Sequence, residues 1–198
     1  MKLDTDYESV KESIIAASKE VFIRHGYAKV SMDDISKASG KGRSTLYHYF
    51  KNKKEVFEAF ATAEFSQLIH VAKSKIKSEY TFNENLFAYN KAKLAELKSL
   101  LQQYKNILDD IREQPDSMCR MNKLMVEEES EVIKGMLLWG IGKGEVAQMS
   151  AADLDFLTNV MVIAFRSFEQ EIVMYEGLAE LENKLQWLVN ILCKGLKK

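Results

Sequence analysis

The N-terminal fold is decided by the stretch Ser31-Met-Asp-Asp-Ile-Ser-Lys-Ala-Ser-Gly-Lys-Gly-Arg-Ser-Thr-Leu-Tyr-His-Tyr-Phe50. Ser31 with Asp34 three residues later is a capping-box pattern, which predicts the start of a short helix. The glycine-containing turn at residues 39–42 then separates this helix from a second one. In the second helix Leu46 and Phe50 are one turn apart, so both can point toward the same core.

A longer helix is expected before this pair, over residues 8–25. Val10, Ile14, Ala17 and Val21 recur there at helical spacing, and Gly26 suits the left-handed position that ends a helix. Two short helices joined by a small turn and braced by a longer helix predict a helix-turn-helix. The second helix of such a motif lies in the DNA major groove, with its N-terminal residues nearest the base edges.

Charge is distributed unevenly along the chain. The net charge of all 198 residues is −1, but Gly40–Lys54 carries five lysine or arginine residues and no acid. Such a cluster suits a polyanion, because each cation that meets a phosphate releases counterions. A solvated loop is the alternative when charge is considered alone. The cluster falls on the helix that would enter DNA, which favours a binding surface.

The remaining sequence predicts an all-α protein with about nine helices. Hydrophobic residues make up 46% of the chain and charged residues 29%, and a single proline with nine glycines favours long helices. Capping residues, glycines and Pro115 bound the expected segments. These segments are 55–77, 85–113, 118–139, 150–175 and 178–196.

Several classes of protein are disfavoured by what the sequence lacks. No apolar run approaches the roughly 18–20 residues of a membrane span, and the acidic N-terminus does not resemble a signal peptide, so we expect a cytoplasmic protein. Cys119 and Cys193 fit no zinc or redox spacing, and we expect no metal and no cofactor. Gly140-Ile-Gly-Lys-Gly144 lacks the spacing of a nucleotide-binding loop and is better interpreted as a helix end. No nucleophile elbow or metalloprotease motif is present, so we expect no enzyme.

Residues 8–57 resemble the DNA-binding domain of the TetR/AcrR family of bacterial transcriptional regulators. The matching runs are Phe22-Ile-Arg-His-Gly-Tyr27, Val30-Ser-Met-Asp-Asp-Ile35 and Ser44-Thr-Leu-Tyr-His-Tyr-Phe-Lys-Asn-Lys-Lys-Glu-Val-Phe57. One departure is Tyr47-His48-Tyr49-Phe50, where the family often has Tyr-x-His-Phe. The resemblance implies a helix-turn-helix domain over residues 1–52 and a helical effector-binding and dimerisation domain over 53–198.

The resemblance also implies roles for individual residues at the DNA. Arg43 would grip guanine with its planar fork, and Lys53 would contact the flanking phosphate backbone. Ser31 would hold a phosphate at a helix N-terminus or would only cap that helix, and Thr45 alternatively faces the core. The complete expected set is Ser31, Lys41, Gly42, Arg43, Ser44, Thr45, Tyr47, His48 and Lys53.

Two further sets follow for the second domain, each with plain core packing as the alternative. Methionines and aromatic residues, which suit adaptable apolar pockets, would line an effector site: Phe87, Tyr89, Tyr104, Met118, Met121, Met125, Met136 and Trp139. Apolar stripes on the last two long helices would form a homodimer interface: Leu157, Met161, Phe165, Phe168, Leu181, Leu185, Leu188 and Leu192.

The function that these features predict is a one-component transcriptional repressor. It would bind a palindromic operator as a dimer and leave DNA when a small apolar or aromatic effector tilts its fourth helix. The alternative is an all-α protein-interaction module that does not touch DNA.

Overall fold

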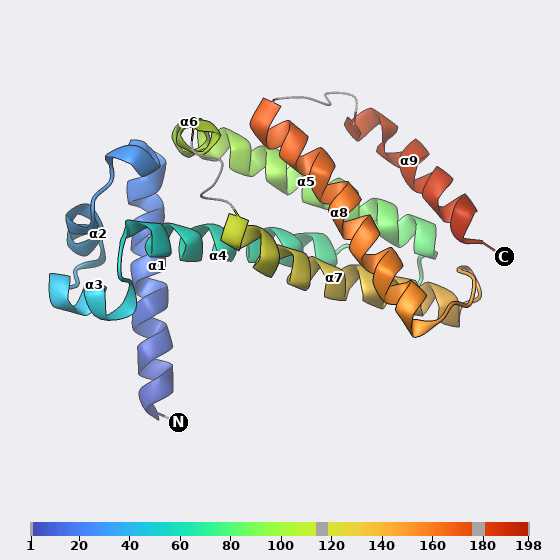
Figure 1. Ribbon diagram of the computed structural model, residues 1–198, viewed down its shortest axis with the longest axis horizontal. Coiled ribbons are helices and arrows are strands. Elements are labelled where there is room, and N and C mark those ends of the chain that lie inside the picture. Colours follow the sequence, from blue (N-terminus) through green and yellow to red (C-terminus); the bar gives the residue numbers. More distant parts are fainter. Residues whose placement is uncertain (1, 114–118, 176–180, 198) are drawn as a thin grey trace. The chain divides into compact units, whose positions relative to one another are not determined.

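The computed structural model describes residues 2–113, 119–175 and 181–197, and all the secondary structure in these ranges is helical (Figure 1). The predicted all-α class and helix count are confirmed for this part of the chain. The helices are α1 Lys2–Lys29, α2 Met32–Ser39, α3 Arg43–Tyr49, α4 Lys53–Lys73, α5 Phe82–Gln103, α6 Lys105–Glu113, α7 Cys119–Gly142, α8 Ala151–Tyr175 and α9 Leu181–Leu196.

The chain divides into two compact units. The first comprises Met1–Glu64 with Leu101–Met121, and the second comprises Phe65–Leu100 with Asn122–Lys198. The predicted domain boundary after residue 52 therefore falls inside the first unit. The first unit also recruits α6, because Tyr104 just before it packs on the Phe60 ring at 5.6 Å and donates a hydrogen bond to Glu64.

Helix α1 is broken near its end by Gly26. We expected this glycine to end the helix, and it does interrupt it, with φ 75° and ψ 174°, although helical structure resumes as far as Lys29. The break leaves backbone groups without helical partners, and side chains of α6 form hydrogen bonds with these groups. The Asp110 carboxylate accepts from the Ala28 amide at 2.8 Å, and the Asn106 amide donates to the Ile23 carbonyl at 3.2 Å.

The two short helices form as the sequence predicted. Ser31 caps α2 in a reciprocal capping box with Asp34. Gly40 follows α2 in the left-handed conformation, with φ 64°, and the Ser36 hydroxyl donates to the Lys41 carbonyl at 2.6 Å. These contacts fix the turn before α3, so that Leu46 is fully buried while the opposite side of the helix is exposed.

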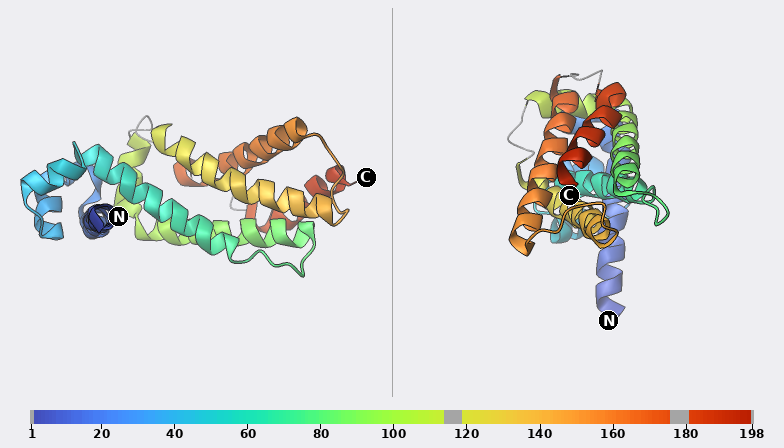
Figure 2. Two further views of the ribbon diagram at one scale, coloured as in Figure 1. Left: turned by 90° about the horizontal axis from the view of Figure 1, so that it is seen from below. Right: turned by 90° about the vertical axis from the view of Figure 1, so that its right-hand side faces the viewer.

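The second unit is a helical bundle around one core (Figure 2). Apolar side chains from the end of α4 and from α5, α7, α8 and α9 meet there, among them Leu86, Leu137 and Val162, each fully buried. The glycines after Trp139 end α7 as predicted, since the amides of Glu145 and Val146 both donate to the Gly140 carbonyl. In the described part of the chain, no helix has both the length and the apolar character needed to cross a bilayer.

Gly26→Ala should destabilise the protein. A Cβ atom at this position would lie 2.7 Å from Asp110 Oδ2, and the positive φ angle itself strains any residue that carries a side chain. We expect the free energy of unfolding in urea to fall by about 1–3 kcal/mol. The matched control is Gly135→Ala in α7, where nothing lies within 4 Å of the added methyl group. That change should stabilise the protein by about 0.5–1 kcal/mol. A change of free energy of unfolding in the same direction for both variants would contradict the requirement for glycine at position 26.

Candidate nucleic-acid interface

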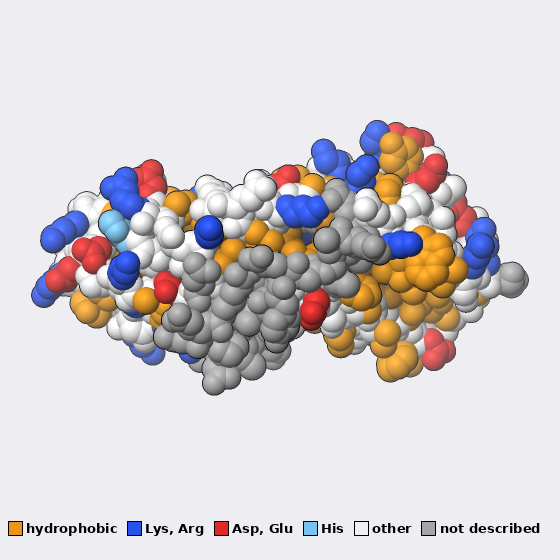
Figure 3. All heavy atoms as spheres, turned by 90° about the horizontal axis from the view of Figure 1, so that it is seen from above, with side chains coloured by type: hydrophobic (Ala, Val, Ile, Leu, Met, Phe, Trp, Pro, Cys, Tyr) orange, Lys and Arg blue, Asp and Glu red, His pale blue; other side chains and the backbone are white. Residues whose placement is uncertain are grey.

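Helix α3 presents a polar, exposed face. Arg43, Ser44 and His48 are exposed, and Tyr47 keeps 52% of its surface accessible. Gly42, the N-cap residue of α3, is exposed as well, while Lys41 and Thr45 are half-buried. The structure thus brings most of the predicted DNA-contacting residues to one side of α3. Figure 3 shows lysine and arginine side chains on the surface of this first unit, with acids between them.

Arg43 forms an ion pair with Asp33 of α2. Both side chains are well exposed, at 69% and 42% of their surface. The hydrogen bond to Asp33 raises the pKa of Arg43 further, so the guanidinium remains charged. An exposed pair of this kind contributes only about 0–1 kcal/mol. Asp33 therefore orients the guanidinium at the start of α3 but holds it only weakly.

Ser31 caps α2, and this confirms the capping role that the sequence allowed. Its hydroxyl accepts from the Asp34 amide at 3.3 Å, and the Asp34 carboxylate accepts from the Ser31 amide at 3.0 Å and from the Ser31 hydroxyl at 2.5 Å. These hydrogen bonds lower the pKa of Asp34. Because the hydroxyl donates to a carboxylate, a phosphate at this position would have to displace or share that bond.

Lys53 lies at the start of α4, as predicted, and its ammonium is bonded within the protein. Its ammonium donates to the carbonyls of Tyr27 and Ala28, at 2.8 and 3.2 Å, and lies 4.5 Å from the centre of the Tyr27 ring. Burial lowers the pKa of Lys53. The predicted contact of Lys53 with a phosphate stays a prediction. Lys53 ties the start of α4 to the end of α1, where carbonyls lack helical partners.

An aromatic contact that sequence reasoning missed supports α3 from the start of α1. The Tyr7 ring packs 4.5 Å from that of Tyr49 and 5.9 Å from that of His48. Tyr7 precedes the helix predicted at residue 8, and extending the helical pattern by one turn is the signal that could have found it. His48 is thereby positioned by rings on two sides.

The predicted effector residues do not form one group. Tyr89 and Met136 are buried in the core of the second unit, and Phe87 and Trp139 pack partly against it. Tyr104 belongs to the first unit, where its hydroxyl bonds Glu64, and this part of the prediction is corrected. Met118 and the side chains of Met121 and Met125 lie outside the described residues.

A buried charged cluster in the second unit was also missed. Lys93 is paired with Glu129 and, at 2.5 Å, with Glu169, and the side chains of Lys93 and Glu129 are at most 1% exposed. Burial raises the pKa of Glu169, and burial together with the nearby glutamates raises that of Tyr89. The signal was available, since Lys93 lies one turn after Tyr89 on the buried side of α5, where a lysine requires an acidic partner.

The predicted dimer residues point mainly into the protomer. Met161, Phe165 and Leu185 are at most 5% exposed and belong to the core of the second unit, which corrects their assignment to an interface. Leu157, Phe168, Leu188 and Leu192 are partly buried against that core, and the side chain of Leu181 is outside the described residues. Among the described side chains of α8 and α9, the exposed large apolar residues are instead Phe156, Val160, Ile163, Trp187 and Ile191.

The fold and the exposed face of α3 define a helix-turn-helix protein. Residues 14–60 match the family described as bacterial regulatory proteins, tetR family. Over 86 residues the chain is 29% identical to the HTH-type transcriptional regulator QacR of Staphylococcus aureus, an alignment that covers 43% of this chain and 46% of that protein. The chain spans about half or less of the length of the curated relatives it matches.

Solved structures extend the similarity of fold to almost the whole chain. A TetR-family transcriptional regulator from Pectobacterium atrosepticum superposes with a TM-score of 0.70 at 21% identity, covering 98% of this chain and 96% of that one. A SmeT–triclosan complex superposes with a TM-score of 0.64 at 17% identity, covering 96% and 92%. The match to the tetR family of bacterial regulatory proteins covers residues 14–60, and the solved structures share the fold of the chain.

Ser31→Ala should reduce stability in a pH-dependent way. Loss of the N-cap hydroxyl is expected to lower the free energy of unfolding by about 1 kcal/mol at pH 7. Asp34 has a lowered pKa in the folded state, so its contribution is complete above its ordinary value of 3.8 and is lost as pH falls through the folded value. The difference between the wild type and the variant in urea unfolding should therefore narrow from pH 6 to pH 3. Ser13→Ala, which removes the hydroxyl of an exposed serine inside α1, is the control. Its free energy of unfolding should follow that of the wild type from pH 6 to pH 3.

Proposed function

We propose that this protein is a one-component transcriptional repressor that binds duplex DNA through α3. The single observation that supports this most is the exposed polar face of α3, which begins at the glycine N-cap and includes Arg43, Ser44 and Tyr47. Leu46 anchors the opposite side in the core, so the exposed face is presented at a fixed orientation. The match of residues 14–60 to a family of regulatory proteins supports the same conclusion.

Base reading is assigned to Arg43. Its planar guanidinium can donate two hydrogen bonds to guanine, an interaction worth about 1–3 kcal/mol in discrimination. The exposed pair with Asp33 contributes less than that, so Arg43 can exchange this partner for a base. Lys51, which is exposed just after α3, is a cation available for a phosphate.

The functional form is a homodimer, because two short recognition helices bind paired half-sites far better than one binds alone. The surface that suits a dimer interface is the side of α8 and α9 that faces away from the core of the second unit. Phe156, Val160 and Ile163 recur at i, i+4 and i+7 on α8 and are 72%, 45% and 58% exposed. On α9, Trp187 and Ile191 are 61% and 48% exposed. Exposed apolar side chains at helical spacing typically mark an interface between proteins.

An apolar or aromatic effector would bind within the second unit and release the DNA. Tyr89 and Met136 place an aromatic ring and an adaptable thioether in its core. The fold is shared with SmeT, which was solved in complex with triclosan, a small aromatic molecule. Helix α4 contributes residues to both units, and a shift of this helix on effector binding would be the step that releases the DNA. A protein-interaction module that does not bind DNA is the competing function.

Selection of bound duplexes from random DNA tests the proposal. We expect an inverted repeat, whose affinity falls steeply as salt rises because phosphate contacts release counterions. Arg43→Ala should cost about 1–3 kcal/mol on the selected site and relax the preference at one base pair of each half-site. Lys51→Ala should weaken all duplexes alike.

The control is Lys73→Ala, an exposed lysine of α4 in the second unit, which should leave DNA affinity unchanged. Fluorescence anisotropy with the selected site and a scrambled duplex distinguishes a loss of sequence preference from a uniform loss of affinity. A chain that binds no duplex at low salt, or an Arg43 variant that weakens every sequence equally, would refute the proposed reading of DNA.

Replacement of Phe156 and Ile163 by glutamate should abolish the dimer. Both side chains are largely exposed in the protomer, so the fold should tolerate the change while the buried charges oppose association. Analytical ultracentrifugation should show a dimer for the wild type and a monomer for the variant, with a parallel loss of operator affinity. Gln67→Glu on the exposed surface of α4 is the control and should remain dimeric. A double variant that still dimerises would place the interface elsewhere.

A further inference from the structure

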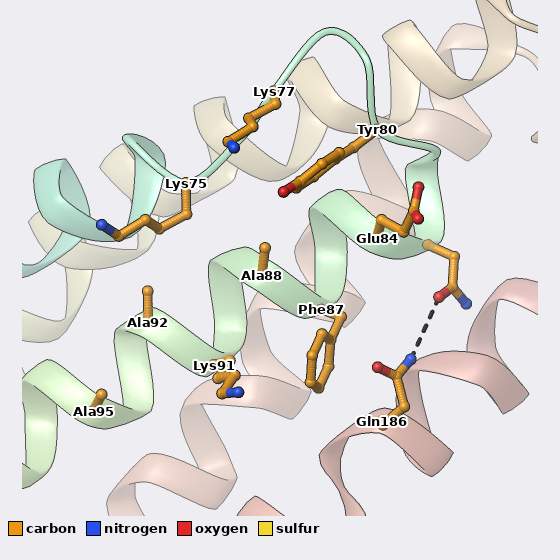
Figure 4. Close-up of a pocket in the computed structure, with 11 residues that line it drawn as sticks. Lys75, Lys77, Tyr80, Glu84, Phe87, Ala88, Lys91, Ala92, Ala95 and Gln186 are labelled. Carbon is orange, nitrogen blue, oxygen red and sulfur yellow. Dashed lines mark hydrogen bonds between the residues drawn. The ribbon is translucent and has the colours of Figure 1, made fainter.

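A surface groove in the second unit is lined by α5, by the segment after α4 and by α9. Its volume is about 660 Å³, which is within the range of small-molecule sites. Figure 4 shows Lys75, Lys77 and Tyr80 on one side of α5 and Gln186 of α9 on the other. None of these residues belongs to the predicted effector set. Phe87 alone is shared with that set.

The floor of the groove is apolar and smooth. Ala88, Ala92 and Ala95 lie along one side of α5 at helical spacing and span about 10 Å. The rings of Tyr80 and Phe87 lie near the Ala88 end of this strip, as Figure 4 shows. Methyl groups beside two aromatic rings offer an apolar surface on which a ring system can stack.

The rim of the groove is cationic. Lys75, Lys77 and Lys91 line it, and in the part of the chain that the structure describes none of the three forms an ion pair. Two of them lie over rings, Lys77 at 4.9 Å from the centre of Tyr80 and Lys91 at 5.7 Å from that of Phe87. The groove therefore holds excess positive charge beside apolar surface.

Glu84, the one acid of the lining, is committed to a structural role. Its carboxylate accepts from the amide and the hydroxyl of Thr81, both at 2.8 Å, at the start of α5. These bonds lower the pKa of Glu84. One carboxylate held at a helix end leaves the three lysines largely uncompensated.

The groove is preorganised by polar contacts beneath and beside it. Asn85, which is 1% exposed, accepts from the Lys77 amide at 2.8 Å and donates to the Lys77 carbonyl at 2.9 Å, so it fixes the segment that carries the lysine. At the α9 end, Asn83 donates to Asn190 at 3.0 Å, and Gln186 donates to Asn190 at 3.1 Å. The amides at this end satisfy one another, which leaves the lysines as the groups that require a partner.

We propose that this groove binds a small organic anion with a flat apolar body and one carboxylate. The body would stack over Ala88 and Ala92 beside the two rings, and the carboxylate would accept hydrogen bonds from Lys77 and Lys75. Charge complementarity excludes cations of the same shape, and the alanine floor excludes purely polar anions. The groove lies on the surface of the second unit, with Phe87 and Ala92 of its lining packed partly against the core, and its occupation does not depend on DNA binding.

Isothermal titration calorimetry with three naphthalene probes tests this site on the full chain. 2-Naphthoate should bind with 1:1 stoichiometry, whereas 2-naphthol and 2-naphthylmethylammonium, which keep the ring but lack the anion, should bind at least tenfold more weakly. Lys77→Gln should weaken 2-naphthoate about tenfold, the value of one charged hydrogen bond. Ala88→Leu should abolish binding by filling the floor, and Lys184→Gln, which is outside the groove, should leave it unchanged.

Three results would overturn the proposal: no binding of 2-naphthoate, equal binding of all three probes, or binding that survives both groove substitutions. Each differs from failure of the proposed regulator, which would appear only in the DNA measurements. A chain that binds 2-naphthoate at the groove but no duplex would refute the regulator and support the groove.

Discussion

The first unit depends on how the broken backbone at the end of α1 is satisfied. Gly26 removes the helical partners of several backbone groups between Ile23 and Ala28, and these groups need other hydrogen-bond partners. Asn106 and Asp110 from α6 and Lys53 from α4 bond these groups. Two segments distant in the sequence, α4 and α6, therefore converge on the break in α1, which fixes where the chain leaves α1 and enters α2.

In the second unit the groups that need partners are buried charged side chains and not backbone groups. Lys93 sits between Glu129 and Glu169 in surroundings that raise the pKa of the latter. Replacing such a group by an apolar residue of similar volume is often neutral, but removing a single partner typically costs about 3–5 kcal/mol. The cluster therefore contributes little net stability, yet it opposes any repacking of α5, α7 and α8 that would separate its members.

Local patterns allowed much of the first unit to be predicted from sequence. The capping box at Ser31, the left-handed glycine at residue 40 and the buried Leu46 depend on neighbours within four or five residues, so their signals are contained in the sequence. The contacts of Lys53 and Tyr104 were not predicted because their partners, the Tyr27 carbonyl and the Glu64 carboxylate, lie 26 and 40 residues away. Nothing in the local sequence distinguishes a lysine that bonds carbonyls from one that contacts phosphate.

The apolar stripes of α8 show a different limit. Met161 and Phe165 follow one helical stripe, and Phe156, Val160 and Ile163 follow another on the opposite side. Spacing identifies both stripes, but it does not say which one faces the protomer's own core. That distinction requires the positions of α5, α7 and α9, because these helices cover one stripe and leave the other exposed.

The two faces of α8 also restrict how an effector could act. A helix is stiff over this length, so a ligand that displaces core residues on one face moves the exposed face with them. The response is nevertheless limited by the difference between the ligand's affinities for the two conformational states. A ligand that binds both states equally does not shift the equilibrium between them. Moving a population from 1:99 to 99:1 requires about 10⁴-fold preference for one state. An effector that releases DNA would therefore have to make contacts in the released state that it lacks in the DNA-bound state.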